Sequence, residues 1–234
     1  MTEELKLTRE YIQIRTVDYF RKADGTRPDL RLVLLGNGRK IIVKDFKKSG
    51  WFFKTTLGPI MIAREYDVLE RLRDVDGVPR PVQMIDKYAF AMEYVDGVSL
   101  DKITDKKYLT AELFDGFKKI VAEMHERNIA HCDLRCNGNY MRRRDGKPYI
   151  IDFAAAMIKG KNAMHTWFYN NFEDADTNAV LRLVRKKNPD LLSEEDLKEL
   201  QRVFPLERAA KAVGNPLKAM FKIFSGGKVK KSKD

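Results

Sequence analysis

The chain has 234 residues, 44% of them hydrophobic and 34% charged, an ordinary composition for a globular protein that excludes a wholly disordered chain. Its 45 Lys and Arg outnumber 34 Asp and Glu, and the net charge of +11 favours anionic partners such as nucleotides, nucleic acid or phospholipid head groups. The acidic start and the lack of an apolar run of roughly 18 residues predict a cytoplasmic protein without a membrane span.

The first part of the chain is predicted to form antiparallel strands. Polar and apolar residues alternate over 9–20, which favours a strand. Two more strands are expected over 30–35 and 40–46, joined by the Gly-Asn-Gly turn at 36–38. The turn between the first two strands contains a single glycine, Gly25.

Residues 47–57 join this sheet to the first predicted helix. They combine Trp51, Phe52 and Phe53 with three lysines, which fits either a lipid-facing or substrate loop or aromatic side chains packed against the sheet. A helix is predicted over 59–73, because apolar residues recur there at spacings of three and four.

The remaining elements alternate between strands and helices. Strands are expected over 82–85 and 88–94, followed by a helix over 110–127 with Thr110 as its N-cap and Asn128 as its stop. A helix over 173–187 comes next. Another helix begins after Ser193, whose hydroxyl is a suitable N-cap. The acidic residues that follow Ser193 favour the N-terminal end of the helix dipole.

The most informative stretch lies between 131 and 154. His-Cys-Asp-Leu occupies 131–134 in a predicted loop, and Ile-Asp-Phe-Ala occupies 151–154 at the end of a hairpin. The hairpin turns at the Asp-Gly pair 145–146, which suits a type I′ turn. This arrangement places two carboxylates at the ends of adjoining segments.

Phosphoryl transfer needs few protein groups, because its loose transition state leaves mainly positioning and charge neutralisation to the enzyme. One carboxylate must face the acceptor hydroxyl. A second carboxylate and an amide must hold Mg²⁺, which prefers oxygen ligands. Asp133, Asp152 and Asn139 fit these three tasks.

These motifs resemble those of the protein-kinase superfamily, in which H-R-D-L and D-F-G occupy the corresponding positions. The resemblance implies an α+β, two-lobed fold, with a small antiparallel-sheet N-lobe over 1–94, a mainly helical C-lobe over 95–205 and a tail over 206–234. It also implies ATP and Mg²⁺ as cofactors and Asp133 as the group that faces the acceptor. Arg135 would contact the transferred phosphate, or else cap a carbonyl.

The resemblance extends to the nucleotide-binding residues. Lys44 ends an Ile-Ile-Val-Lys strand and is expected to contact the phosphates, with Glu65 as its partner and Glu70 as the competing candidate.

The stretch around 91–100 resembles the kinase hinge. Met92 stands at the gatekeeper position, and the backbone of Glu93, Tyr94 and Val95 would bind the adenine edge. The alternative for these residues is an edge strand that ends in a turn.

The chain departs from the family pattern in three ways. Gly138 stands where the family has its metal-binding Asn, so we choose Asn139 as the ligand and leave Asn137 as the alternative. Ala154 replaces the Gly of D-F-G and restricts the backbone beside Asp152. The G-x-G-x-x-G loop is also missing, so the phosphates must be held by other means.

The two cysteines of the chain, Cys132 and Cys136, both lie in the predicted catalytic loop. We expect reduced thiols, because a disulfide would clamp this loop. A zinc site that adds His131 is the alternative, although it would crowd Asp133 and its spacing fits no common zinc finger.

A narrower resemblance concerns the acceptor. Asp176 and the segments 181–183 and 188–193 look like the C-terminal part of small bacterial kinases that phosphorylate lipopolysaccharide core sugars, a group related to the RIO-type atypical kinases. It implies a core sugar hydroxyl as the acceptor. A RIO-type protein serine/threonine kinase and a pseudokinase that binds anionic partners are the alternatives.

The tail from Leu206 carries eight Lys or Arg against Glu207 and Asp234, a net charge of +6. A basic amphipathic helix predicted after Pro216 suits the anionic inner face of the cell membrane, where the protein would bind peripherally. The alternative is docking of this helix on the C-lobe. Nucleic acid is the less favoured partner.

Overall fold

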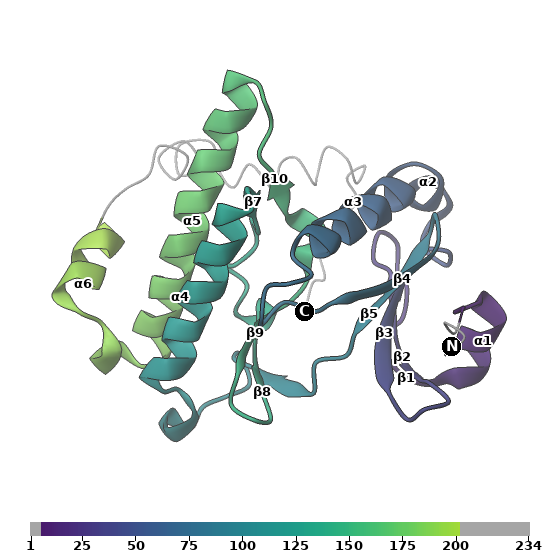
Figure 1. Ribbon diagram of the computed structural model, residues 1–234, viewed down its shortest axis with the longest axis horizontal. Coiled ribbons are helices and arrows are strands. Elements are labelled where there is room, and N and C mark those ends of the chain that lie inside the picture. Colours follow the sequence, from purple (N-terminus) through teal and green to yellow (C-terminus); the bar gives the residue numbers. More distant parts are fainter. Residues whose placement is uncertain (1–5, 202–234) are drawn as a thin grey trace, which may run out of the picture.

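The computed structural model describes residues 6–201 and shows a sheet-rich N-lobe beside a helical C-lobe (Figure 1). The N-lobe elements are α1 (Arg9–Arg15), β1 (Thr16–Arg21), β2 (Asp29–Leu34), β3 (Lys40–Asp45), α2 (Trp51–Thr55), α3 (Leu57–Arg71), β4 (Pro81–Asp86) and β5 (Ala89–Glu93). The C-lobe elements are β6 (Gly97–Ser99), α4 (Ala111–Glu126), β7 (Ile129–Ala130), β8 (Tyr140–Arg143), β9 (Pro148–Ile150), β10 (Met157–Ile158), α5 (Ala163–Lys187) and α6 (Glu194–Gln201). The predicted two-lobed α+β class is confirmed.

The N-lobe is built on a five-stranded sheet with the order β1-β2-β3-β5-β4, in which all neighbours are antiparallel. Successive side chains of β3 alternate between its two faces. Ile41 and Val43 pack with Leu7 and Ile12 on the face that α1 covers. Lys44 points to the other face, where it meets α3. The two faces of one strand therefore serve different parts of the lobe.

The strand predicted over 9–20 is wrong in its first half. Arg9–Arg15 form helix α1, and the strand begins only at Thr16. The helix forms because the hydroxyl of Thr8 accepts a hydrogen bond from the N–H of Tyr11 at 3.2 Å and because Ile12 is buried against the sheet. Local alternation was outweighed by this cap and this packing.

The segment between sheet and helix contains a short helix, α2, and not a loop. Phe53 is buried and packs on Phe46 with 5.3 Å between ring centroids. Trp51 and Phe52 remain 77% and 64% exposed. One aromatic ring therefore packs on the sheet and two face outward, and a lipid or substrate role for the two exposed rings stays a prediction. Helix α3 matches the predicted helix over 59–73 closely.

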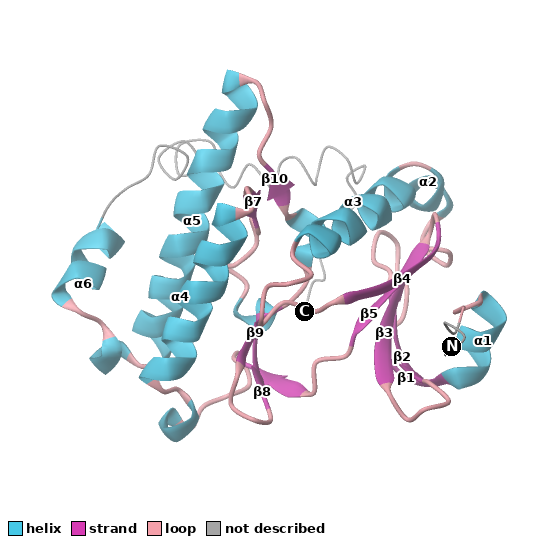
Figure 2. Ribbon diagram, in the orientation of Figure 1, coloured by secondary structure: helices cyan, strands magenta, loops and turns pink. Residues whose placement is uncertain are grey.

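The C-lobe is organised by α4 and α5, which pack against each other (Figure 2). Thr110 caps α4, as predicted, by accepting a hydrogen bond from the N–H of Leu113. Helix α5 begins at Ala163, well before the predicted start at 173, because Asn162 caps it through the N–H of His165 at 2.7 Å. None of the described helices combines the length and apolar character needed to cross a bilayer.

The short strands of the C-lobe hold the loops that carry Asp133 and Asp152. β6, β8 and β9 form a three-stranded sheet whose β8–β9 hairpin turns at Gly146, with φ of +92°. β7 pairs with β10 and frames the loop that carries Asp133. The tail from 206, including the helix predicted after Pro216, lies outside the described residues.

Candidate active site

A buried ion cluster joins the two lobes. Lys44 on β3 donates from Nζ to Glu65 Oε1 of α3 at 2.8 Å and to Asp152 Oδ1, which follows β9, at 2.9 Å. Lys44 and Glu65 are buried, whereas the Asp152 side chain is 43% exposed. The structure thus brings together three predicted residues that are far apart in the sequence.

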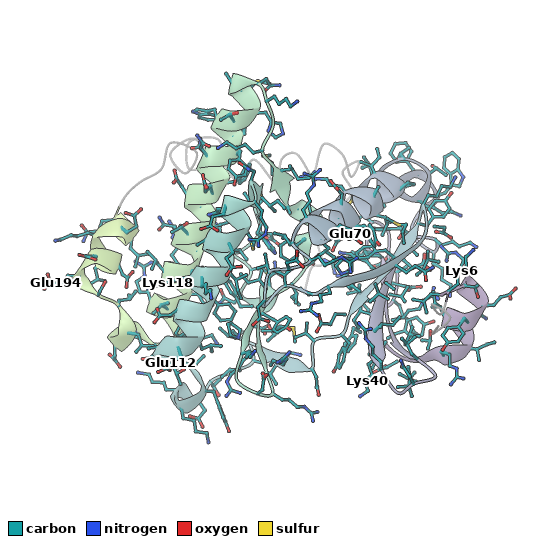
Figure 3. All side chains as sticks on the ribbon, viewed as in Figure 1. Lys6, Lys40, Glu70, Glu112, Lys118 and Glu194 are labelled. Atoms are coloured by element: carbon teal, nitrogen blue, oxygen red, sulfur yellow. The ribbon has the colours of Figure 1, made fainter. Side chains whose placement is uncertain are left out.

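Glu70, the competitor of Glu65, lies elsewhere. It is on the outer side of α3, labelled in Figure 3, where its carboxylate pairs with Arg73 at 2.6 Å. Glu65 faces Lys44 because it lies on the buried stripe of α3 with Ile62 and Leu69. Helical spacing therefore decides between the two candidates.

Lys44 and Asp152 stabilise each other's charge, whereas burial raises the pKa of Glu65 against the attraction to Lys44. Burial would lower the pKa of Lys44, but attraction to Glu65 and Asp152 outweighs it and raises the pKa above its ordinary value. The same attraction to Lys44 lowers the pKa of Asp152 to about 2, against the opposing effect of burial. Lys44 is therefore charged and Asp152 ionised over the physiological pH range.

The backbone places Asp152 in an uncommon conformation. Its φ of 66° and ψ of 71° lie in the left-handed region, and the chain then forms a single 3₁₀ turn over Phe153–Ala155. Ile151 is fixed by a hydrogen bond from its N–H to the carbonyl of Asn139 at 2.9 Å. Arg64 of α3 also donates to the carbonyl of Ala156. The segment is thus held from both lobes.

The loop that carries Asp133 is anchored by Asp176, which was not among the predicted site residues. Asp176 is buried in α5 and accepts from the N–H of His131 at 2.5 Å and from that of Cys132 at 3.1 Å. Cys132 has a φ of 67°, so the anchor sustains a strained turn next to Asp133. The available sequence signal was a carboxylate on the apolar face of a helix, since Val180 follows it one turn later.

His131 has a packing and hydrogen-bonding role. Its Nε2 lies 3.1 Å from the carbonyl of Ile151 and its Nδ1 accepts from the N–H of Asp133 at 3.3 Å, which assigns the proton to Nε2. The ring also packs on Phe153 at 4.7 Å between centroids. The histidine thereby links the segments of Asp133 and Asp152.

Asp133 and Asn139 contact each other directly. The amide Nδ2 of Asn139 donates to the Asp133 carbonyl at 2.9 Å and to Oδ2 at 3.1 Å. Asp133 is an exposed residue, yet the loop removes enough water from its carboxylate to raise the pKa above its ordinary value, against the effect of the Asn139 bond. Arg135 lies exposed in the same loop.

The zinc interpretation of this loop is wrong. Over residues 6–201, no group of three or more His, Cys, Asp or Glu side chains is arranged to hold a metal ion. Cys132 and Cys136 are free thiols. His131 is turned toward Ile151, and Cys132 Sγ donates to the carbonyl of Ala130 at 3.5 Å, so the three candidate ligands do not converge.

The predicted hinge begins inside β5, whose last two residues are Met92 and Glu93, and continues through Tyr94 and Val95. Met92 pairs with Ile42 on β3. The N–H of Glu93 donates to the carbonyl of Arg80 at 2.8 Å, so this donor is used within the N-lobe and is not available to a ligand. Tyr94 stacks on Phe20 of β1 with 6.1 Å between centroids and an interplanar angle of 20°. Val95 is buried where the chain enters the C-lobe.

Comparison with known proteins identifies relatives of this arrangement. A family model described as RIO domain matches residues 42–197. A crystal structure of the Rio2 kinase from Chaetomium thermophilum has a TM-score of 0.59 and 14% identity, covering 93% of this chain and 76% of that chain. The same kinase in an ADP/Mg²⁺-phosphoaspartate complex gives 0.58 and 14%, covering 92% and 71%. No curated protein matches the sequence significantly.

Proposed function

Because this chain belongs to the RIO-domain family, we propose that it is an ATP-dependent kinase that phosphorylates a hydroxyl group on a protein. The observation that carries the proposal is the joining of Lys44, Glu65 and Asp152 from both lobes. A kinase requires such a lysine, an orienting carboxylate and a metal-binding carboxylate together.

The nucleotide would lie between the sheet and the catalytic loop. Lys44 would contact its phosphates, because Glu65 holds the charged ammonium in place. Met92 and the backbone of Glu93, Tyr94 and Val95 would line the adenine. The N–H of Glu93 is engaged with Arg80, so the carbonyl of Glu93 is the group that it would offer to the adenine.

The residues present fit Mg²⁺. Asp152 offers an ionised carboxylate that is 43% exposed, and the amide of Asn139 offers a second oxygen while its Nδ2 is held by Asp133. Mg²⁺ prefers such oxygen ligands. When bound, the ion neutralises charge on the phosphate oxygens.

Asp133 would orient the acceptor hydroxyl and accept its proton. Its exposed position leaves room for an acceptor, and partial desolvation raises the pKa of its carboxyl, which makes it a better base than an ordinary aspartate. Arg135, exposed two residues later, would contact the transferred phosphate.

A protein acceptor agrees with the family, whereas nothing in the comparisons supports a lipopolysaccharide core sugar. One observation nevertheless keeps a glycolipid as the second candidate. Large apolar side chains are exposed on α2 and at the start of α5, with Trp51 77%, Met164 69% and Trp167 48% exposed. Lysines 47, 48, 159 and 161 flank them, a combination that suits an anionic lipid surface.

The test is phosphate transfer from radiolabelled ATP with Mg²⁺, using the protein alone, casein and deacylated core glycolipid as acceptors, with Asp133→Asn as the control. We expect either casein or the kinase itself to become labelled, and we expect Asp133→Asn to abolish this labelling. Because the Rio2 complex contains a phosphoaspartate, labelled kinase is also treated with hydroxylamine, which removes acyl phosphate but not phosphoserine.

Phosphate transfer to the glycolipid but not to protein would show that the acceptor is a glycolipid, the second candidate. ATP binding without transfer to any acceptor would favour the pseudokinase. A protein that binds no ATP would refute the proposed function.

A further inference from the structure

The turn after β1 occupies the place where protein kinases carry a glycine-rich loop over the phosphates. Here β1 ends at Arg21 and the turn has one glycine, Gly25, with φ of +53°. Without a series of glycines the backbone cannot approach the phosphates in the usual way. A different group must fill this role, and the strand register identifies one.

Arg21 and Lys44 lie on the same face of the sheet. Arg21 pairs with Leu30 on β2, and Leu30 pairs with Lys44 on β3. Directly opposed residues of antiparallel strands share a face, and two strand spacings separate their Cα atoms by about 10 Å. Arg21 on β1 and Lys44 on β3 therefore both lie on the side of the sheet that faces Asp152.

A bulge in β1 produces this orientation. Tyr19 pairs with Arg31, and the register shifts between Tyr19 and Arg21. Arg31 belongs to the opposite face, where it contacts Asp45 at 2.9 Å and stacks near Tyr19. Without the extra residue, Arg21 would share the face of Tyr19, so the bulge turns Arg21 toward the nucleotide side.

Charge and anchoring also favour a ligand at Arg21. Lys44 already donates to Glu65 and to Asp152, so its ammonium is shared between two carboxylates before a phosphate binds. Arg21 lies in the same cross-strand row as Lys44, on the face of the sheet where Lys44 meets Asp152. Its Nε donates to the carbonyl of Pro28 at 3.2 Å, which anchors the guanidinium across the turn.

We propose that Arg21 forms a phosphate subsite for the nucleoside triphosphate, in place of the backbone amides of a glycine-rich loop. The planar guanidinium with several donors suits phosphate oxygens. The subsite rests on the proposed ATP-dependent function, and it assigns to β1 a side-chain contact that the catalytic motifs do not include.

The test compares Arg21→Ala with Lys22→Ala. Both remove one positive charge, but Lys22 lies on the other face, with its Nζ 5.9 Å from the ring centroid of Tyr19. ATP and adenosine binding are measured by titration calorimetry with Mg²⁺. We expect Arg21→Ala to weaken ATP binding about tenfold or more and to leave adenosine binding unchanged, because a charge-assisted hydrogen bond is lost. Arg21→Lys should be intermediate, and Lys22→Ala should resemble the wild type.

Four results would overturn the subsite. Wild-type ATP affinity in Arg21→Ala would refute it while leaving the kinase function intact. An equal loss of ATP and adenosine affinity would show that Arg21 only supports the turn through Pro28, and an equal loss in Lys22→Ala would show a non-specific charge effect. A wild-type protein that binds no ATP would refute the proposed function as well as the subsite.

Discussion

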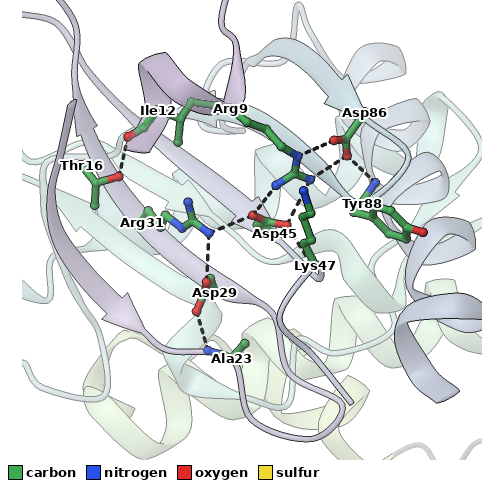
Figure 4. A network of polar contacts seen from close by, with 10 residues as sticks. All are labelled: Arg9, Ile12, Thr16, Ala23, Asp29, Arg31, Asp45, Lys47, Asp86 and Tyr88. Atoms are coloured by element: carbon green, nitrogen blue, oxygen red, sulfur yellow. Dashed lines mark hydrogen bonds and ion pairs between the residues drawn. The ribbon is translucent and has the colours of Figure 1, made fainter. Parts of the chain in front are cut away.

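The two faces of the N-lobe sheet carry contrasting ion networks, although they begin at adjacent residues of β3. Asp45 points to the face covered by α1 and is 1% exposed. It accepts hydrogen bonds from Arg9 at 2.9 Å, from Arg31 at 2.9 Å and from the N–H of Lys47 at 2.8 Å (Figure 4). Lys44 points to the other face, where its partner Asp152 is 43% exposed.

The first network, which we call the closed network, leaves no carboxylate oxygen of Asp86 unengaged: this side chain is 36% exposed, but both of its oxygens accept hydrogen bonds from Arg9. Arg9 also bridges to Asp86 at 2.5 Å, and Arg31 also contacts Asp29 at 3.1 Å, so this network ties α1 to strands β2, β3 and β4. The second network, which we call the open network, ends at Asp152, whose 43% exposed carboxylate can still take a ligand. A buried charged residue therefore does not by itself indicate a ligand-binding site. A buried charged residue whose ionic partner remains accessible to a ligand does.

The largest effect is expected on catalysis at the open network. Asp133→Asn should lower the rate of phosphate transfer by about 10²- to 10⁴-fold, because the hydroxyl loses its base. Steady-state transfer from labelled ATP measures this. Asp145→Asn on the β8–β9 hairpin, paired there with Arg143, is the control and should keep wild-type activity. Equal rates for Asp133→Asn and the wild type would remove Asp133 from the mechanism.

On the closed network the effect should fall on stability. Asp45→Ala leaves Arg9 and Arg31 without their shared carboxylate and should lower the free energy of unfolding by about 3–5 kcal/mol. Urea unfolding measures this change. At temperatures where the variant is folded, ATP affinity should stay close to that of the wild type. A folded variant that has lost ATP binding would contradict the separation of the two faces.

Glu65→Gln tests whether the open network positions Lys44. The side chain keeps its size, but the ammonium loses one ionic partner and becomes free to move, so the turnover rate should fall about 10²-fold. Glu70→Gln on the outer side of the same helix is the matched control and should leave turnover unchanged. Equal losses in both variants would indicate a general effect on α3.

The smallest effect concerns pH. The pKa of Asp152 is about 2 in the folded protein and 3.8 in its ordinary state, so its pairing with Lys44 stabilises the fold above pH 3.8. This contribution is lost as the pH falls from about 4 to 2. Asp152→Asn should therefore be less stable than the wild type at pH 6, and the two should converge toward pH 2. A constant difference across this range would contradict the pairing.

Much of this organisation could be predicted from the sequence. Asp133 and Asp152 stand out because catalytic groups occur in short fixed motifs, and Glu65 because helical spacing places it on the buried stripe. α1 was missed because the alternation over 9–20 fits a strand, while the helix depends on packing of Ile12 against the sheet and on the binding of Arg9 by the distant Asp45 and Asp86. The anchoring role of Asp176 was missed because its partners are the backbone N–H groups of His131 and Cys132, which a sequence does not display. The orientation of Arg21 depends on a bulge that alternation alone cannot reveal.

The most direct test of the central claim, that the open network on the Lys44 face is the nucleotide and metal site, is a calorimetric titration of the wild type and Asp152→Asn with ATP, with and without Mg²⁺. The wild type should bind ATP more tightly with Mg²⁺, and Asp152→Asn should lose this dependence because the metal loses its ionised ligand. Equal Mg²⁺ dependence in both proteins would contradict the claim.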